Sequence, residues 1–320
     1  MSKEESGYRL DSHFPNIERN GEVEMKTISK QKNILLFSFL LIPIFLLLVF
    51  VLYPLIELIR LSFTDWNGVE AHQVYIGFDN YIKMFTDSSD VWLSLRNNGI
   101  YFIFHSIMIP LELMIAVLLD SKIRASKFFK TIVFMPYIIN GVAISYIFAF
   151  FYSPINGGLN GMLEVLGLES LIQNWLTNDS IVNISLVFVS IWRFSGFHVI
   201  LFLAGLQSIP QDQFEAAEID GANSIQNFWY IILPGVKKVL EVILFLNVVG
   251  ALQVFDIPYI MTQGGPGHAS STFILYTLET AFKFNSFGMA SAMGITMLIL
   301  ILILNGVQNR LFNLKGVGEE

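Results

Sequence analysis

Long uninterrupted apolar runs constrain this chain more than any other feature. A helix needs roughly 20 mostly apolar residues to cross a bilayer, and six segments of the chain reach that length: 33–56, 99–120, 129–152, 181–206, 236–260 and 286–309. Only helices and closed barrels span lipid, because backbone groups cannot stay unpaired there. A barrel strand alternates apolar and polar residues over about ten positions, whereas the first run, ILLFSFLLIPIFLLLVFVLYPL, is apolar on every side. The sequence therefore predicts an all-α, polytopic membrane protein with six transmembrane helices.

The composition agrees with this class. Of the 320 residues, 54% are hydrophobic and 14% are charged, whereas a soluble domain carries about 25% charged residues. About thirty polar residues precede the first run, and no short apolar region with a cleavage site occurs, so the first run is expected to stay as an anchor. Residues 1–32 and 310–320 are the expected tails. The chain has no cysteine, which excludes thiolate chemistry and a cysteine-based metal site.

Basic residues predict the orientation of the spans, because they are enriched in cytoplasmic loops. With the N-terminus inside, 14 of the 19 lysines and arginines are cytoplasmic: Lys3, Arg9, Arg19, Lys26, Lys30, Lys32, Lys122, Arg124, Lys127, Lys130, Lys237, Lys238, Arg310 and Lys315. The outer side receives Arg60, Lys83, Arg96 and Lys283. Both termini and the segment between the fourth and fifth spans are therefore expected in the cytoplasm. The basic residues lie scattered at the ends of apolar runs, so no nucleic-acid partner is expected.

A polar segment, residues 207–235, separates the fourth and fifth spans. Its centre reads EAAEIDGANSIQNFWYIILP. Ser208, with Gln211 three positions later, is typical of a capping box, and it predicts a short helix that ends near Ile219. A solvated loop would explain the acidic residues, but not the paired alanines, the glycine and the terminal proline.

The second half of this segment predicts another short helix. Gly221 supplies the left-handed geometry that ends the first helix. Asp220 is expected to cap the second one, which runs from Asn223 to Ile232, and Pro234 is expected to start the next span. The small side chains of Ala216 and Ala217 would let a partner approach the backbone of the first helix closely.

These residues resemble a known signature. E-A-A, three residues, G, nine residues and I-x-L-P is the cytoplasmic motif of permease subunits of ATP-binding-cassette (ABC) importers. The matching positions are Glu215, Ala216, Ala217, Gly221, Ile231, Leu233 and Pro234. FTDWNG, IGFDNYIKMF, IWRFSGFHVILFLAGLQSIP and FDIPYIMTQGGPG are similar to blocks of the carbohydrate-uptake branch, over roughly residues 33–309. The large outer domain and extra N-terminal spans of the maltose-permease type are not matched.

The resemblance implies a function and a set of partners. The chain is expected to form half of the path for a sugar, an oligosaccharide or glycerol phosphate in a bacterial or archaeal cell membrane. The implied partners are a second related permease, two ATPase subunits or domains, an extracytoplasmic solute-binding protein and membrane lipid. ATP and magnesium would bind to the ATPases, and no cofactor to this chain. The signature residues and Asp220 would couple the chain to an ATPase.

Ionisable residues inside a membrane usually face a cavity or a partner. Glu112 and Arg193 lie about 13 and 12 residues into two spans of the same direction, so they are expected at equal depth and in an ion pair. The pair would either lock the bundle or, with Phe194, Phe197 and Asn247 nearby, line the substrate path. His105 and His198 are expected to be hydrogen-bonded core residues and not metal ligands.

Two other classes of membrane protein compete with the importer subunit. A self-sufficient secondary transporter or channel would show two repeated halves with ion-coupling carboxylates, and no such repeat is seen. A membrane-embedded enzyme would need a catalytic cluster, and neither HExxH nor GxSxG occurs. The identity of the solute and of the partners is not readable from this chain.

Overall fold

The computed structural model describes residues 35–121 and 124–314. The predicted N-terminal tail, residues 1–32, and residues 315–320 of the predicted C-terminal tail lie outside the described residues. Contacts divide the chain into two units, residues 1–57 and 58–320, and each unit is described by itself.

The described part of the first unit is helical. It belongs to a candidate span, Leu35–Ser62, which includes the π-helical stretch η1 (Leu48–Leu52) and continues as α2 (Tyr53–Ser62). No side chain of its most apolar window is buried. The first predicted span is therefore a helix whose apolar side chains are free to meet lipid.

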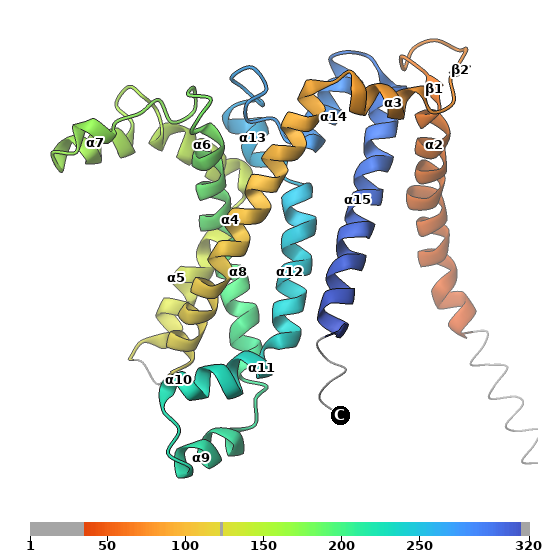
Figure 1. The fold of residues 1–320 in the computed structure, drawn as a ribbon. Coiled ribbons are helices and arrows are strands. Elements are labelled where there is room, and N and C mark those ends of the chain that lie inside the picture. The colour runs from red at the N-terminus through yellow and green to blue at the C-terminus, as the bar shows by residue number, and fades with distance from the viewer. Residues whose placement is uncertain (1–34, 122–123, 315–320) are drawn as a thin grey trace, which may run out of the picture. The chain divides into compact units, whose positions relative to one another are not determined.

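The second unit contains the remaining elements (Figure 1). They are β1 (Thr64–Asp65), β2 (Val74–Tyr75), α3 (Asp79–Thr86), α4 (Ser89–Asp120), α5 (Ser126–Ile138), α6 (Gly141–Phe151), α7 (Gly158–Val165), η2 (Glu169–Leu171), α8 (Val182–Leu206), α9 (Gln211–Ile219), α10 (Ser224–Asn227), η3 (Phe228–Ile232), α11 (Leu233–Gly235), α12 (Lys237–Leu252), α13 (Asp256–Met261), α14 (Phe273–Phe282) and α15 (Phe287–Leu314). β1 and β2 form a short antiparallel pair, and all the other elements described in this unit are helices.

The predicted fold class is confirmed. Within the described ranges five helices are long and apolar enough to cross a membrane, and there are six spans if the bent pair α5 and α6 counts as one. The second span begins ten residues earlier than predicted, at Ser89, because its first turns are polar and hydropathy does not mark them. The Ser88 hydroxyl accepts a hydrogen bond from Val91 N (3.4 Å) and so fixes this start.

Two spans are interrupted. α5 and α6 meet at an angle of 94°, and the Asn140 side chain caps α6 by accepting a hydrogen bond from Val142 N (2.8 Å). The fifth span breaks between α12, which ends at Leu252, and α13, which begins at Asp256. Irregular backbone inside a membrane needs polar partners from neighbouring helices, so these two breaks are candidate functional positions.

α8 is the central helix of the second unit. It packs against α4, α5, α12 and α13. Gly196 permits the close approach of α5, since a Cβ atom at this position would overlap the carbonyl oxygen of Val133. Three buried apolar clusters then hold the helices together, one of them around Leu113, Phe202 and Ile243.

The second unit has two distinct ends (Figure 1). α9, α10 and α11 lie at one end, together with the starts of α5 and α12, and we name it the α9 end. α7, α13 and α14 lie toward the opposite end, which we name the α7 end. The polar segment predicted between the fourth and fifth spans is therefore gathered at one end of the bundle.

Candidate functional site

The helix with the E-A-A residues, α9, projects at the α9 end (Figure 1). None of its residues is buried. Glu215 and Ala216 are exposed, and Ala217 is half-buried. A helix without a buried residue gains little stability from packing within this chain, and most of its surface is open to another protein.

Gly221 ends α9 as predicted. Its φ is +75°, in the left-handed region that glycine adopts without strain. Gly221 N donates to Glu218 O (3.1 Å), and Ala222 N donates to Ala217 O (2.8 Å), which is the pattern of a Schellman motif. A Cβ atom on Gly221 would meet nothing within 4 Å, so the glycine is required by the backbone and not by crowding.

The caps predicted for the two helices of this segment are wrong. The Ser208 hydroxyl donates to Gly205 O (2.6 Å) at the end of α8 and does not cap α9. Asp220 belongs to the C-terminal turn of α9. Asn223 caps α10 instead, because its side chain accepts from Gln226 N (2.9 Å) while Asn223 N donates to the Gln226 side chain (2.8 Å). The segment therefore has a capping box at Asn223 and Gln226, but this box caps α10, and α9 has no side-chain cap.

The second half of the segment is attached to the bundle. Phe228, Ile232 and Leu233 pack against the buried cluster that contains Leu206 and Val236. Pro234 lies in α11 and not at the start of the span, and Ile231 is half-buried. This half of the segment is therefore in contact with the end of α8 and with Val236, the residue before α12.

Apolar side chains are also exposed along this segment. Four of them are at least half exposed, and they lie on both short helices: Ile219 (86%), Ile225 (71%), Trp229 (58%) and Tyr230 (79%). Exposed aromatic residues of this kind are typical of protein–protein contacts. The segment thus exposes apolar side chains on α9, α10 and η3, while Phe228, Ile232 and Leu233 attach it to the bundle.

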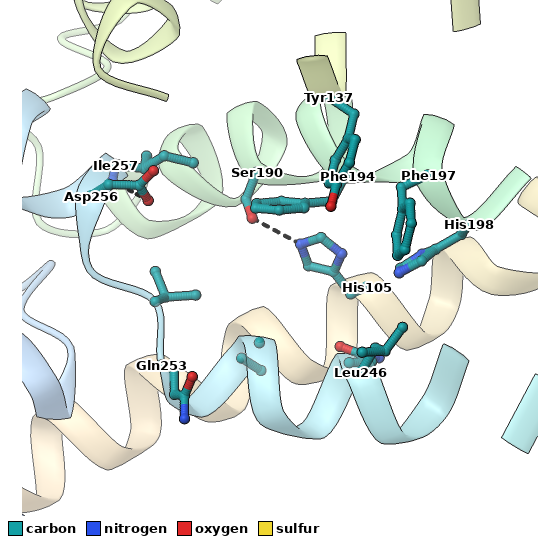
Figure 2. Close-up of a pocket in the computed structure, with 14 residues that line it drawn as sticks. His105, Tyr137, Ser190, Phe194, Phe197, His198, Leu246, Gln253, Asp256 and Ile257 are labelled. Atoms are coloured by element: carbon teal, nitrogen blue, oxygen red, sulfur yellow. Dashed lines mark hydrogen bonds between the residues drawn. The ribbon is translucent and has the colours of Figure 1, made fainter. Parts of the chain in front are cut away.

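A pocket of about 280 Å³ lies among α4, α5, α8, α12 and α13 (Figure 2). Its lining combines aromatic rings with hydrogen-bonding groups: His105, Tyr137, Ser190, Phe194, Phe197, His198, Leu246, Asn247, Gly250, Ala251, Gln253, Val254, Asp256 and Ile257. The ring of Tyr137 stacks on that of Phe197, with centroids 4.6 Å apart. Asn247 is held by a hydrogen bond from its amide nitrogen to Ser106 Oγ (2.9 Å).

The predicted path residues all lie in or directly behind this wall. Phe194, Phe197 and Asn247 line the pocket. Glu112 and Arg193 do not line it, but each bonds to a residue that does. The sequence therefore placed these five residues around one cavity without showing how they are connected.

The predicted ion pair between Glu112 and Arg193 is wrong. The Arg193 guanidinium pairs with the carboxylate of Asp256 at the start of α13. Glu112, which is fully buried, lies 2.9 Å from Nδ1 of His198. Equal depth in two spans does not fix the direction in which each side chain points, and the break in the fifth span brings Asp256 to Arg193.

Gly141, the first residue of α6, lies against this ion pair. A Cβ atom at this position would overlap both Asp256 Oδ2 and Arg193 Nη1. The Arg193 guanidinium carbon also lies 4.9 Å from the centre of the Phe194 ring, in cation–π geometry. The bend of the third span, the break of the fifth span and α8 therefore meet at one charged contact.

The two histidines are hydrogen-bonded residues, as predicted. His105 is buried, with Nε2 3.0 Å from the hydroxyl of Ser190. His198 bonds to Glu112. Within the described residues no group of three or more potential ligands could hold a metal ion.

Comparison with known proteins decides the family. The model of the binding-protein-dependent transport system inner membrane component matches residues 108–313, which is more than half of the chain. The chain belongs to this family. The matched region contains the whole polar segment and most of the pocket lining.

Relatives of this permease agree. A probable ABC transporter permease protein, YurN of Bacillus subtilis, is 36% identical over 276 residues, which are 85% of this chain and 94% of that protein. The multiple sugar-binding transport system permease protein MsmF of Streptococcus mutans is 31% identical over 86% of this chain and 93% of that protein. The predicted resemblance to ABC importer permeases is confirmed, and it favours an importer subunit over a self-sufficient secondary transporter.

A solved structure shows the same fold. It is a bacterial ABC transporter involved in the import of the acidic polysaccharide alginate, with a TM-score of 0.77 at 24% identity over 89% of this permease and 99% of that chain. The likeness supports the helical architecture described above. The permease is a multi-pass membrane protein, and a transport subunit in its family role.

The buried asparagines that hold the backbone around the break after α12 were not predicted from the sequence. Asn98 donates to the carbonyls of Ala251 (2.6 Å) and Leu252 (3.2 Å), and its side-chain oxygen accepts from Phe273 N (2.9 Å). It thereby satisfies the carbonyl groups that the break after α12 leaves free. The hydroxyl of Thr272 donates to Val254 O (2.6 Å) in the same break.

Asn97 and Asn183 hold the glycine-rich loop between α13 and α14, residues 262–272. The Asn97 amide donates to the carbonyls of Ala269 and Ser271 (both 2.9 Å). Asn183 donates to Ala269 O (2.6 Å) and to Asn97 Oδ1 (3.1 Å). The signal in the sequence was the polar RNN stretch just before the second predicted span, which has no place in a lipid-facing helix.

Proposed function

We propose that this permease forms half of the translocation path of an ATP-driven, binding-protein-dependent importer for a sugar or oligosaccharide. The family supports the importer role. The names of relatives such as the multiple sugar-binding permease, and the fold shared with the alginate importer, support the carbohydrate class.

The coupling role rests on one observation: α9 carries the E-A-A signature with no buried residue, while η3 and α11 pack against the bundle core through Phe228, Ile232 and Leu233. We propose that Glu215, Ala216, Ala217, Asp220, Gly221, Ile231, Leu233 and Pro234 couple the permease to an ATPase. ATPase contact free energy must differ between the two transport states for this coupling to drive motion. The anchored half would pass that difference to α8 and α12.

The remaining partners follow from the same proposal. A second related permease would complete the path, two ATPase subunits or domains would bind ATP and magnesium, and an extracytoplasmic protein would deliver the solute. The α9 end would be cytoplasmic, as the basic residues indicate. The chain would lie in the cell membrane of a bacterium or an archaeon, with lipid around its apolar faces.

The pocket is the proposed part of the substrate path. Stacked aromatic rings suit the apolar faces of sugar rings, and Asn247 and Asp256 offer hydrogen-bonding groups for hydroxyls. The charge of Arg193 is matched by Asp256. None of the described lining residues is an arginine or a lysine, which favours an uncharged sugar over a phosphate.

The path proposal can be tested on α8 alone. Phe197→Leu keeps an apolar side chain but removes the flat ring from the pocket, and it is expected to raise the KM of uptake several-fold at unchanged membrane content. Phe188→Leu is the matched control, because Phe188 lies on the same helix and is 55% exposed. Equal KM values for both variants would remove Phe197 from the path.

The importer proposal is tested by isolating the chain from its native membrane in mild detergent and identifying the proteins that accompany it. A Walker-motif ATPase and a second permease are expected. A chain that purifies alone and transports solute into liposomes without ATP would overturn the proposal.

A further inference from the structure

The short helix α7 has one buried residue, the polar Asn160. Asn160 is 5% exposed. Its side-chain oxygen accepts a hydrogen bond from Trp175 Nε1 (2.7 Å), and its amide nitrogen donates to Gln173 O (3.3 Å). α7 is thus attached to the rest of the chain through this polar contact and through Leu159, which packs against a buried apolar cluster that contains Tyr152.

The opposite side of α7 is apolar and exposed. Met162 is 57% exposed, Val165 88% and Leu166, directly after the helix, 67%. The apolar surface continues past the helix with Leu168 (42%) and Leu171 (52%) in and beside η2. Between Gly158 and Leu171 the sequence has two charged residues, Glu164 and Glu169, and no lysine or arginine.

A water-facing amphipathic helix buries its apolar side and exposes its polar side, whereas α7 buries Asn160 and exposes Met162 and Val165. Burying a side chain of the size of valine, leucine or methionine is worth about 1.5–3 kcal/mol, so a run of such side chains turned to water would forfeit several times that amount. Contiguous apolar patches on a protein surface mark contacts with lipid or protein. The environment of α7 is therefore apolar.

We propose that the surface formed by Met162, Val165, Leu166, Leu168 and Leu171 lies in the outer boundary of the lipid bilayer, with α7 parallel to the membrane plane. Figure 1 shows α7 lying crosswise to α8 at the α7 end, next to the end of α6. Helices with apolar side chains on one side lie in the interface in this way.

Continuity with a span selects lipid as the occupant. α6 is the second half of the bent span, at the α7 end, and it exposes Tyr146, Ile147 and Phe150 along one face. Gly158 seats the start of α7 on the ring of Phe151, at the end of that helix. The start of α7 is thus in contact with a membrane span, and the exposed apolar side chains of α7 begin four residues further along the chain, at Met162.

The neighbouring aromatic residue agrees with this level. Trp175, which holds Asn160, is of the residue type that is enriched where membrane meets water. Glu164 and Glu169 are exposed and can reach the aqueous side. α7 would then set the depth, relative to the bilayer, of the segment that leads into α8.

The chain has no cysteine, so single-cysteine variants can be labelled without background. We would place a nitroxide at Val165→Cys and Leu166→Cys in the complete importer, reconstituted in phosphatidylethanolamine–phosphatidylglycerol nanodiscs. Collision with oxygen, which partitions into lipid, is compared with collision with a water-soluble nickel chelate. Glu169→Cys is the matched control from the same stretch.

The expected result is an oxygen-to-nickel collision ratio several-fold higher at positions 165 and 166 than at position 169. Quenching of a bimane label at Val165→Cys by brominated lipids provides a second measurement, with strong quenching expected. A nickel-dominated signal at 165 and 166 would place α7 in water and overturn the proposal. An immobilised label that neither reagent reaches would also overturn it, in favour of a protein partner.

Discussion

The Arg193 guanidinium on α8 is paired with the carboxylate of Asp256, at the break between α12 and α13. The start of α6 lies against the same pair. Discontinuous spans line solute sites in many transporters, and here two interrupted spans are joined at the wall of the pocket. This contact ties the position of both breaks to α8.

Asp256→Ala should destabilise the permease by leaving Arg193 without its counter-charge. Removing one partner of a fully buried pair costs about 3–5 kcal/mol, and the cost here should be nearer 2 kcal/mol because the Asp256 side chain is 40% exposed. The unfolding temperature of the purified importer in detergent measures the effect. The double variant Arg193→Met, Asp256→Asn should recover most of the loss, whereas a double variant as unstable as Asp256→Ala would show that the charge is not the cause.

Gly141→Ala should have a similar effect on the same contact. The added methyl group would overlap both members of the ion pair, so α6 or the pair has to shift. Gly99→Ala is the control, because Gly99 also lies in a helix and a Cβ atom there meets nothing within 4 Å. Alanine is favoured over glycine inside a helix by about 0.5–1 kcal/mol, so the control should be neutral or stabilised. A loss of stability in both variants would contradict the explanation.

Gly221→Ala should separate transport from ATP hydrolysis. A left-handed backbone costs an alanine roughly 1–2 kcal/mol, and this strain would fall on the junction of α9 and α10 without affecting the core. The expected result is a several-fold lower ratio of solute transported to ATP hydrolysed in proteoliposomes, with little change in unfolding temperature.

Gly77→Ala is the matched control for that variant. Gly77 has a φ of +61° and free space around it, but it lies in the turn before α3, far along the chain from α9. The same backbone strain there should leave the transport ratio unchanged. A similar fall of the ratio in both variants would remove Gly221 from the coupling role.

Asn98→Ala should destabilise the fold strongly. It leaves Ala251 O, Leu252 O and Phe273 N without their buried partner, and buried unsatisfied groups cost about 1–3 kcal/mol each. We expect the free energy of unfolding to fall by about 2–4 kcal/mol, measured by thermal unfolding. The total stays below the sum for three groups because the bond from Asn98 to Leu252 O is long and its loss adds little. Asn67→Ala, which removes hydrogen bonds in an exposed turn, should change stability far less, because water replaces the lost bonds. Equal effects would refute the loop-anchoring role.

The sequence predicted the features that depend on local patterns. The apolar runs indicated the spans, and the left-handed Gly221 ended α9 where expected. The residues around the pocket were found because ionisable and aromatic groups in spans tend to share a cavity. Pairing could not be predicted, because Asp256 reaches Arg193 through a break in a helix that reads as continuous in hydropathy. The early start of α4 could not be predicted from hydropathy, because its first turns are polar. Asn97 in this part of α4 binds loop carbonyls instead of facing lipid.

The most direct test of the account is a cross-link from α9. In the complete importer, Ala216→Cys is joined by a short bis-maleimide to a cysteine in the surface groove of the partner ATPase, and Val69→Cys, 86% exposed in the turn between β1 and β2, serves as the control. We expect an efficient cross-link for Ala216→Cys, a change in its yield when ATP is added, and no cross-link for Val69→Cys. No cross-link from Ala216→Cys in an importer that still transports would contradict the assignment of α9 as the coupling helix.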